Sequence, residues 1–280
     1  MFSLVKRISS TLSKIIAFLP WRFIIIVLPI LVVFAWILFS PGGLLGKADA
    51  IGYAVCHRIN VRSFHIGDRQ ISLCARCTGQ YLGTLVGLAY LSLTKPRRIG
   101  RPPWKIIVPL ILFVIAFVVD GVNSYIQLIP SLAHFSIYSP SNQLRLLTGT
   151  GLGISLSVLL LTAFNQIVWK RRIPSPLIEN YKEFGQLILI GFIIDLLVLI
   201  ENPLILYPFS IISAGGVLLL LSMIYTMVVI MLFRLDNHYE NIHQLIIPAL
   251  SGFLLAMVQI FLLDIIRFML TRTWEGFVIG

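Results

Sequence analysis

Long runs of apolar residues constrain this chain more than any other feature of its sequence. A helix needs about 20 consecutive apolar residues to cross a hydrocarbon layer about 30 Å thick. Runs that approach or exceed this length occur at residues 22–39, 78–94, 106–128, 144–169, 184–201, 209–233 and 244–268. In lipid, helices satisfy their own backbone hydrogen bonds, which irregular chain cannot do. The sequence therefore predicts an all-α, polytopic transmembrane helical bundle of about seven spans.

Composition argues against a soluble globular protein. The chain is 58% hydrophobic and 12% charged, whereas soluble domains have about a quarter charged residues. No long linker or low-complexity tract divides the sequence, so we expect a single membrane domain over residues 1–280. Within it, residues 1–21 form a basic amphipathic segment that we expect to rest on the membrane surface. Residues 180–280 form an additional three-helix portion.

The positive charge of the chain predicts its orientation in the cytoplasmic membrane. The net charge is +11, but most basic residues lie beside apolar runs, which favours contacts with anionic lipid head groups over nucleic acid. Lysines and arginines gather at residues 6–22, 95–105 and 170–182, so we expect the N-terminus to be cytoplasmic. The loop 40–77 is then extracytoplasmic. It nevertheless carries five basic residues against the bias, which indicates a site: Lys47, Arg58, Arg62, Arg69 and Arg76.

The segment CHRINVRSFHIGDRQISLCARCTG, residues 56–79, contains all three cysteines of the chain. Cys56, Cys74, Cys77 and one histidine would supply the ligand set of a tetrahedral zinc site. The same soft ligands suit iron. We prefer His65 as the fourth ligand, with His57 as the alternative, because His57 directly follows Cys56 and is awkwardly placed to share its metal.

Two other interpretations of this segment stay open. Cys74 and Cys77 form a C-x-x-C pair at the start of an apolar run, where the helix N-terminus and Arg76 favour a reactive thiolate. On the oxidising side of the membrane, such a pair is typical of thiol–disulfide or quinone-linked membrane enzymes. Alternatively, the cysteines only staple the loop together through a disulfide or a structural metal.

The same stretch resembles a known family. The matching patches are CH (56–57), RSFH (62–65), RQ (69–70), LCARCTG (73–79), YLG (81–83), DG (120–121), NQLRL (142–146) and TG (148–149). Over a core of about residues 50–160, the chain resembles the DUF2085 family of predicted prokaryotic membrane proteins. The resemblance implies an architecture and candidate site residues, and it implies no particular activity.

Charged residues inside the apolar runs are the other candidates for function. Asp120 and Arg145 are expected at similar depth in the outer half of the membrane, where an ionised group is costly unless it is paired. We therefore expect an Asp120–Arg145 ion pair, either structural or functional. Asp120, Arg145 and Arg76 are candidate catalytic residues. The candidate substrate-binding residues are Arg62, Arg69 and Asn142.

Glycines recur every four residues along the second apolar run, at Gly79, Gly83 and Gly87. Such a strip allows a neighbouring helix to approach closely. We expect it to hold the C-x-x-C helix tightly against another span.

Three functions agree with these features, and the sequence leaves open whether the protein is an enzyme. The first is a membrane metalloprotein that binds zinc or iron and acts on an anionic membrane-associated substrate. The second is a redox protein that uses Cys74 and Cys77. The third is a transporter or lipid scramblase with Asp120, Asp195 and Arg145 along its path.

Overall fold

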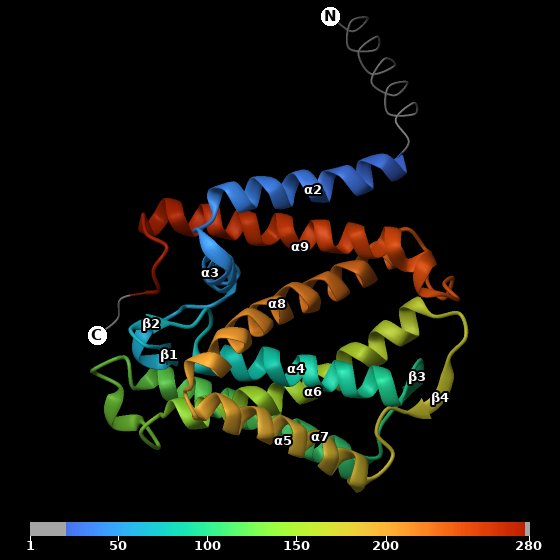
Figure 1. The fold of residues 1–280 in the computed structure, drawn as a ribbon. Helices are drawn as coiled ribbons and strands as arrows, with labels where there is room; N and C mark the ends of the chain where they lie inside the picture. Colours follow the sequence, from blue (N-terminus) through green and yellow to red (C-terminus); the bar gives the residue numbers. More distant parts are fainter. Residues whose placement is uncertain (1–20, 278–280) are drawn as a thin grey trace, which may run out of the picture.

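The structure, a computed structural model, describes residues 21–277. The predicted amphipathic segment at residues 1–21 lies almost entirely outside this part of the chain. The described part is mostly helical (Figure 1), and its helices are α2 (Trp21–Phe39), α3 (Gly43–Val55), α4 (Ala75–Thr94), α5 (Trp104–Ile126), α6 (Asn142–Val168), α7 (Tyr181–Leu199), α8 (Pro203–Leu232) and α9 (Ile242–Thr271). Each predicted apolar run lies mainly in one of these helices. Helix α3, in the cysteine-containing loop, was not predicted.

Fewer helices than predicted have the length and composition of a membrane span. Among residues 21–277, four helices meet both conditions, namely α5, α6, α8 and α9. Helices α2 and α3 meet at an angle of 105° and add a fifth span if they form one broken span. Helix α7 falls outside the group and carries Lys182, Glu183 and Asp195, and α4 contains several polar residues. The structure thus supports a helical protein with four to five candidate spans.

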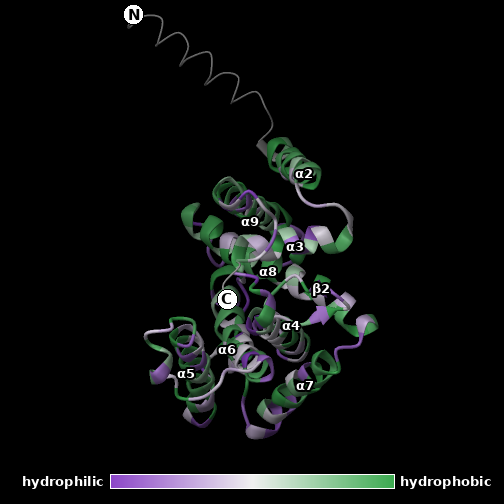
Figure 2. Cartoon of the chain, turned by 90° about the vertical axis from the view of Figure 1, so that its left-hand side faces the viewer, coloured by the Kyte–Doolittle hydropathy of each residue, from purple (hydrophilic) through white to green (hydrophobic). Residues whose placement is uncertain are grey.

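Helices α4 and α6 pack directly against each other at the middle of the fold (Figure 2). The predicted glycine strip on α4 is confirmed, and its partner α6 carries small residues at the facing positions. A Cβ atom on Gly79 would lie 2.2 Å from the backbone oxygen of Leu146, and one on Gly149 would lie 2.2 Å from that of Arg76. Both positions therefore require glycine, and this contact fixes the first turn of α4.

Basic loops meet at one end of the bundle, on the right in Figure 1. Strand β3 (Arg98–Gly100), after α4, pairs in parallel with β4 (Ile173–Pro176), after α6. Lys95 Nζ lies 2.6 Å from Glu183 Oε1, and Lys170 Nζ lies 2.9 Å from Glu240 Oε1. The predicted cytoplasmic basic segments 95–105 and 170–182 thus share one end of the described part of the chain.

The cysteine-containing loop folds over the opposite end, on the left in Figure 1. After α3, it forms a short 3-10 helix (Asn60–Arg62) and a hairpin of β1 (His65–Ile66) and β2 (Arg69–Gln70). Gly67, at the hairpin turn, has φ +61°, a left-handed conformation that glycine adopts without strain. Asp49 of α3 anchors the loop, because its carboxylate accepts hydrogen bonds from Arg69 Nη2 at 2.7 Å and Ser72 Oγ at 2.9 Å.

Candidate functional site

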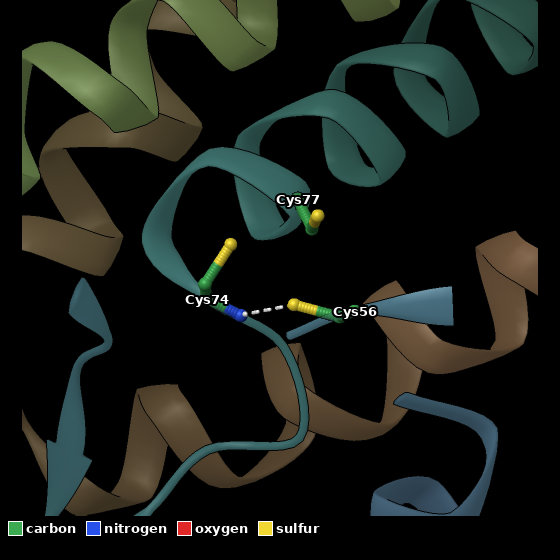
Figure 3. Close-up of side chains that lie close together, drawn as sticks. All are labelled: Cys56, Cys74 and Cys77. Atoms are coloured by element: carbon green, nitrogen blue, oxygen red, sulfur yellow. Dashed lines mark hydrogen bonds between the residues drawn. The ribbon is translucent and has the colours of Figure 1, made fainter. Parts of the chain in front are cut away.

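The three cysteine thiols lie together at this end of the bundle. Their sulfur atoms are within 4.8 Å of one another (Figure 3). Cys74 is the N-cap residue of α4 and Cys77 lies in its first turn, so one helix start provides two of the sulfurs. Cys56 follows the last residue of α3 and faces them. The predicted grouping of these residues in space therefore agrees with the structure.

The surroundings of Cys56 favour its thiolate form. Its sulfur accepts backbone N–H bonds from Cys74, at 3.4 Å, and from Arg58, at 3.5 Å. Hydrogen bonds from the Cys74 and Cys77 thiols, in that order, lower the pKa of the Cys56 thiol well below its ordinary value. The same hydrogen bond to Cys56 raises the pKa of the Cys74 thiol to about 12. Of the three thiols, Cys56 is therefore the one whose ionisation its surroundings favour. A thiolate is the form that binds metals and attacks electrophiles.

Helix α9 holds the segment that carries Cys56. Arg267 Nη1 donates a hydrogen bond to the Cys56 carbonyl at 2.6 Å, and its Nη2 donates to the His57 carbonyl at 3.2 Å. Its guanidinium also stacks on the rings of Tyr53 and Phe277, at 4.0 and 4.4 Å from the ring centroids. One arginine therefore positions the cysteine that the chain supplies from outside α4.

Apolar side chains from the C-terminal helices close the thiol site on one side. Cys56 and Cys74 are buried in a cluster that includes four residues of α8 and α9: Ala214, Val217, Met257 and Ile260. This environment lowers the local dielectric and strengthens any electrostatic interaction of the thiols.

Neither predicted histidine joins the thiols. His65 lies on the hairpin, and its Nε2 donates to Asn60 Oδ1 at 2.8 Å. His57 Nδ1 accepts the Ile59 N–H at 2.9 Å. Within residues 21–277, the close group of potential metal-ligating atoms contains Cys56, Cys74 and Cys77 alone. The predicted four-ligand set thus reduces here to three thiols, because β1 keeps His65 on the outer side of the loop.

The predicted Asp120–Arg145 pair is replaced by an Asp120–Arg76 pair. Arg76 Nε donates to Asp120 Oδ2 at 3.1 Å, and Nη2 also contacts this oxygen. Tyr138 donates to Oδ1 at 2.9 Å, and Asp120 is completely buried. The prediction considered depth alone, and Arg76 reaches Asp120 because the first turn of α4 faces α5 at the same depth.

Two further buried arginines surround this pair. Arg145 Nη1 donates to Asn142 Oδ1 at 2.8 Å, and Arg62 Nη2 donates to the Ser124 carbonyl at 2.6 Å. Arg62 Nη1 and Arg145 Nε are buried and have no hydrogen-bond partner in the described part of the chain. Burial lowers the pKa of the Arg62 guanidinium, and the nearby positive charge of Arg76 lowers it further. Three guanidiniums thus lie near one carboxylate that pairs with Arg76, which leaves a surplus of positive charge and free donors.

The other two predicted substrate-binding residues bind parts of the protein itself. Asn142 Nδ2 donates to the carbonyls of Val61 and Ser63, both at 3.3 Å, and so attaches the loop to the start of α6. Arg69 is paired with Asp49. Their side chains shape the site from its rim.

Several residues of the site were missed by sequence reasoning. The role of Asp49 could have been predicted from one feature of the sequence, because Asp49 is an acidic residue next to a basic loop. Tyr138 and Ser124, which contact Asp120 and Arg76, had no motif around them. Arg267 had no signal either, because it lies more than 200 residues from the cysteine segment and its contacts with residues 56 and 57 depend on tertiary structure.

Comparison with known proteins identifies the family. Residues 56–159 match DUF2085, a family of predicted membrane proteins. An uncharacterized protein of Methanocaldococcus jannaschii is 31% identical over 124 residues, which cover 44% of this chain and 71% of the relative. No solved structure is significantly similar to the chain. The matched region contains all three thiols, Asp120 and the three buried arginines, and the chain belongs to the DUF2085 family of predicted membrane proteins.

Proposed function

We propose that this protein is a membrane metalloprotein in which Cys56, Cys74 and Cys77 bind one zinc or iron ion. The observation that carries the proposal is the proximity of three sulfurs, within 4.8 Å, contributed by two separate segments. Two backbone N–H groups already point at the Cys56 sulfur. Such hydrogen bonds stabilise thiolate ligands and orient them around a metal.

Three protein ligands imply an open coordination position. Structural zinc sites in proteins are almost always closed by four protein ligands, whereas catalytic sites keep a position for water or substrate. The two histidines are engaged in the loop, so a fourth ligand from outside the protein is the simplest completion. This supports a metal that acts on, or binds, an external group.

The arginine cluster, which consists of Arg62, Arg76 and Arg145, supports an anionic group as the external molecule that binds at this site. Arg62, Arg76 and Arg145 carry three positive charges against the single charge of Asp120. A buried surplus of this kind is costly unless an anion compensates it. Arg76 lies between Cys74 and Cys77 at the start of α4, which places the cluster beside the thiols. We infer that these arginines bind the anionic head of a membrane-associated substrate, with Asp120 orienting Arg76.

The membrane arrangement is part of the same proposal. Helices α4 and α7 would cross the bilayer with the more apolar helices, because α4 is covered by α6 and α8 and its polar groups need not face lipid. The basic end, with β3 and β4, would lie in the cytoplasm according to the positive-inside rule. The thiols and arginines would then face the extracytoplasmic side.

Metal analysis of the purified protein tests the proposal. We expect about one zinc or iron ion per chain by elemental mass spectrometry, and three protected thiols that become reactive after chelation. Cys74→Ser should lose the metal, whereas Thr78→Ser, a change of similar size in the same turn, should retain it. The absence of metal in protein purified without chelator would refute the metal site.

The redox alternative gives a different result in the same assay. A Cys74–Cys77 disulfide would leave one thiol in the oxidised protein and release two more on reduction, without stoichiometric metal. Transport or lipid scrambling that survives Cys74→Ser would point to the third class of function.

A further inference from the structure

A cavity lies between α2 and α9, away from the arginine cluster. Its volume is about 390 Å³, in the range of small-molecule sites. Aromatic rings form much of its wall, from Trp36, Phe39, Phe261, Phe268 and Trp274. Its outer rim is apolar and open to the surroundings of the protein, since Phe39 is 71% exposed and Met269 is 63% exposed on these apolar helices.

One carboxylate interrupts this apolar lining. Asp264 of α9 lines the cavity and is only 1% exposed. Its Oδ2 accepts a hydrogen bond from Trp36 Nε1 at 3.0 Å. Its Oδ1 is buried and has no hydrogen-bond partner among residues 21–277. A buried carboxylate oxygen is rarely left without a donor, because losing its hydration is costly.

The nearest arginine on α9 does not satisfy this oxygen. Arg267, one turn further along, directs Nη1 and Nη2 to the backbone carbonyls of residues 53, 56 and 57. The donor that Asp264 lacks can therefore come from a molecule in the cavity.

We propose that this cavity binds a lipid-soluble molecule whose head group donates a hydrogen bond to Asp264 Oδ1. The apolar body of the ligand packs between the aromatic rings, and its single hydroxyl or ammonium group faces the carboxylate. An anionic head is excluded, because the carboxylate would repel it. The proposal does not rest on the metal site or on the arginine cluster.

Photolabelling in nanodiscs tests this site. Three probes carry the same sixteen-carbon chain with a diazirine, and they end in a hydroxyl, a primary amine or a methyl ether that cannot donate. We expect the hydroxyl or the amine probe to label the α2 and α9 peptides of the cavity at least fivefold more than the ether. Preference for one of the two identifies the head group.

Substitutions locate the interaction. Asp264→Leu should reduce labelling by the donor probes to the level of the ether, and Asp264→Asn should affect the amine more than the hydroxyl. Ile265→Trp fills the cavity from its rim without changing the carboxylate, so it tests the site even if the Asp264 variants fail to fold. Asp195→Asn is the matched control, since Asp195 is buried in α7 and accepts a hydrogen bond from Thr150. It should leave labelling unchanged.

Three results would overturn the proposal. These are equal labelling by all three probes, labelling spread over lipid-facing α5 and α7, and full labelling of Ile265→Trp. Circular dichroism and elution as a single peak in size-exclusion chromatography serve as independent readouts of an intact fold in each variant.

Discussion

The Asp120–Arg76 pair gives the sharpest quantitative test of the arginine cluster. Asp120→Asn keeps the size of the side chain, but it replaces one of the two accepting oxygens with a donating NH2 group. It also removes the only carboxylate that faces the three guanidiniums within the described cluster. We expect this substitution to destabilise the protein strongly, because Arg76, Arg62 and Arg145 then repel one another without compensation.

The magnitude follows from burial. The side chain of Arg76 is 10% exposed and that of Asp120 is 0% exposed, so solvent screens the pair little. Two unit charges about 4 Å apart interact by about 4 kcal/mol at an effective dielectric constant of about 20. Removing one partner of a buried ion pair costs about 3–5 kcal/mol in proteins. We therefore expect Asp120→Asn to lower the free energy of unfolding by about 3–5 kcal/mol.

The assay is reversible unfolding in mixed micelles, combined with a double-mutant cycle. Arg76→Gln alone should also destabilise, but the double variant should be less destabilised than the sum of the single variants by about 1–3 kcal/mol, as for directly interacting residues. Asp236→Asn, at an exposed position near the basic end, should cost less than about 0.5 kcal/mol.

An anion should rescue the variant. Phosphate or sulfate should stabilise Asp120→Asn more than the unsubstituted protein, because an anion can take the place of the missing carboxylate. A cost below about 1 kcal/mol for Asp120→Asn, together with no added stabilisation by phosphate, would refute the view that this cluster is a buried cationic site.

Three further substitutions test the packing around the site. Gly149→Ala places a Cβ atom 2.2 Å from a backbone oxygen of α4, so it should destabilise the protein by about 1–3 kcal/mol in chemical unfolding. The control is Gly185→Ala, which has open space around it and should be neutral or slightly stabilising. Arg267→Gln removes hydrogen bonds to the Cys56 carbonyl and to the segment around it. Mass spectrometry should then detect alkylation of Cys56 at least about tenfold faster, which corresponds to about 1.4 kcal/mol in the opening equilibrium. An unchanged rate would mean that other contacts hold the segment. Gly276→Ala introduces a Cβ atom 1.6 Å from a backbone oxygen of the loop, so limited proteolysis should cleave the C-terminal segment sooner than in the unsubstituted protein.

Helix positions were predictable because continuous apolar runs extend over long segments. The run at 144–169 corresponds closely to α6, Asn142–Val168, with only small boundary shifts. Helix α3 was missed because its 13 residues combine glycines, a lysine and an aspartate with apolar side chains. Such a short mixed segment carries no span signal, and it folds as a helix here by packing against α8 and α9.

The partners of charged residues were less predictable than their positions. Sequence spacing predicted how deep Asp120 lies in the bundle. Several helices pass the same depth, so the depth alone does not identify the partner of Asp120. The rotation of each helix decides the pairing, and it depends on the contact of Gly79 and Gly149 between α4 and α6. His65 shows the same limit, because the loop length allowed it to reach the thiols and the hairpin directed it elsewhere.

The C-terminal helices extend the site beyond the region shared with the family. The match ends at residue 159, yet α8 and α9 supply the apolar wall beside Cys56 and Cys74. Arg267 of α9 also holds the carbonyls of residues 56 and 57 in place. A thiol group enclosed in this way reacts only with molecules that can reach it past these helices. The family region therefore supplies the three thiols, and the additional helices cover them on one side in this chain.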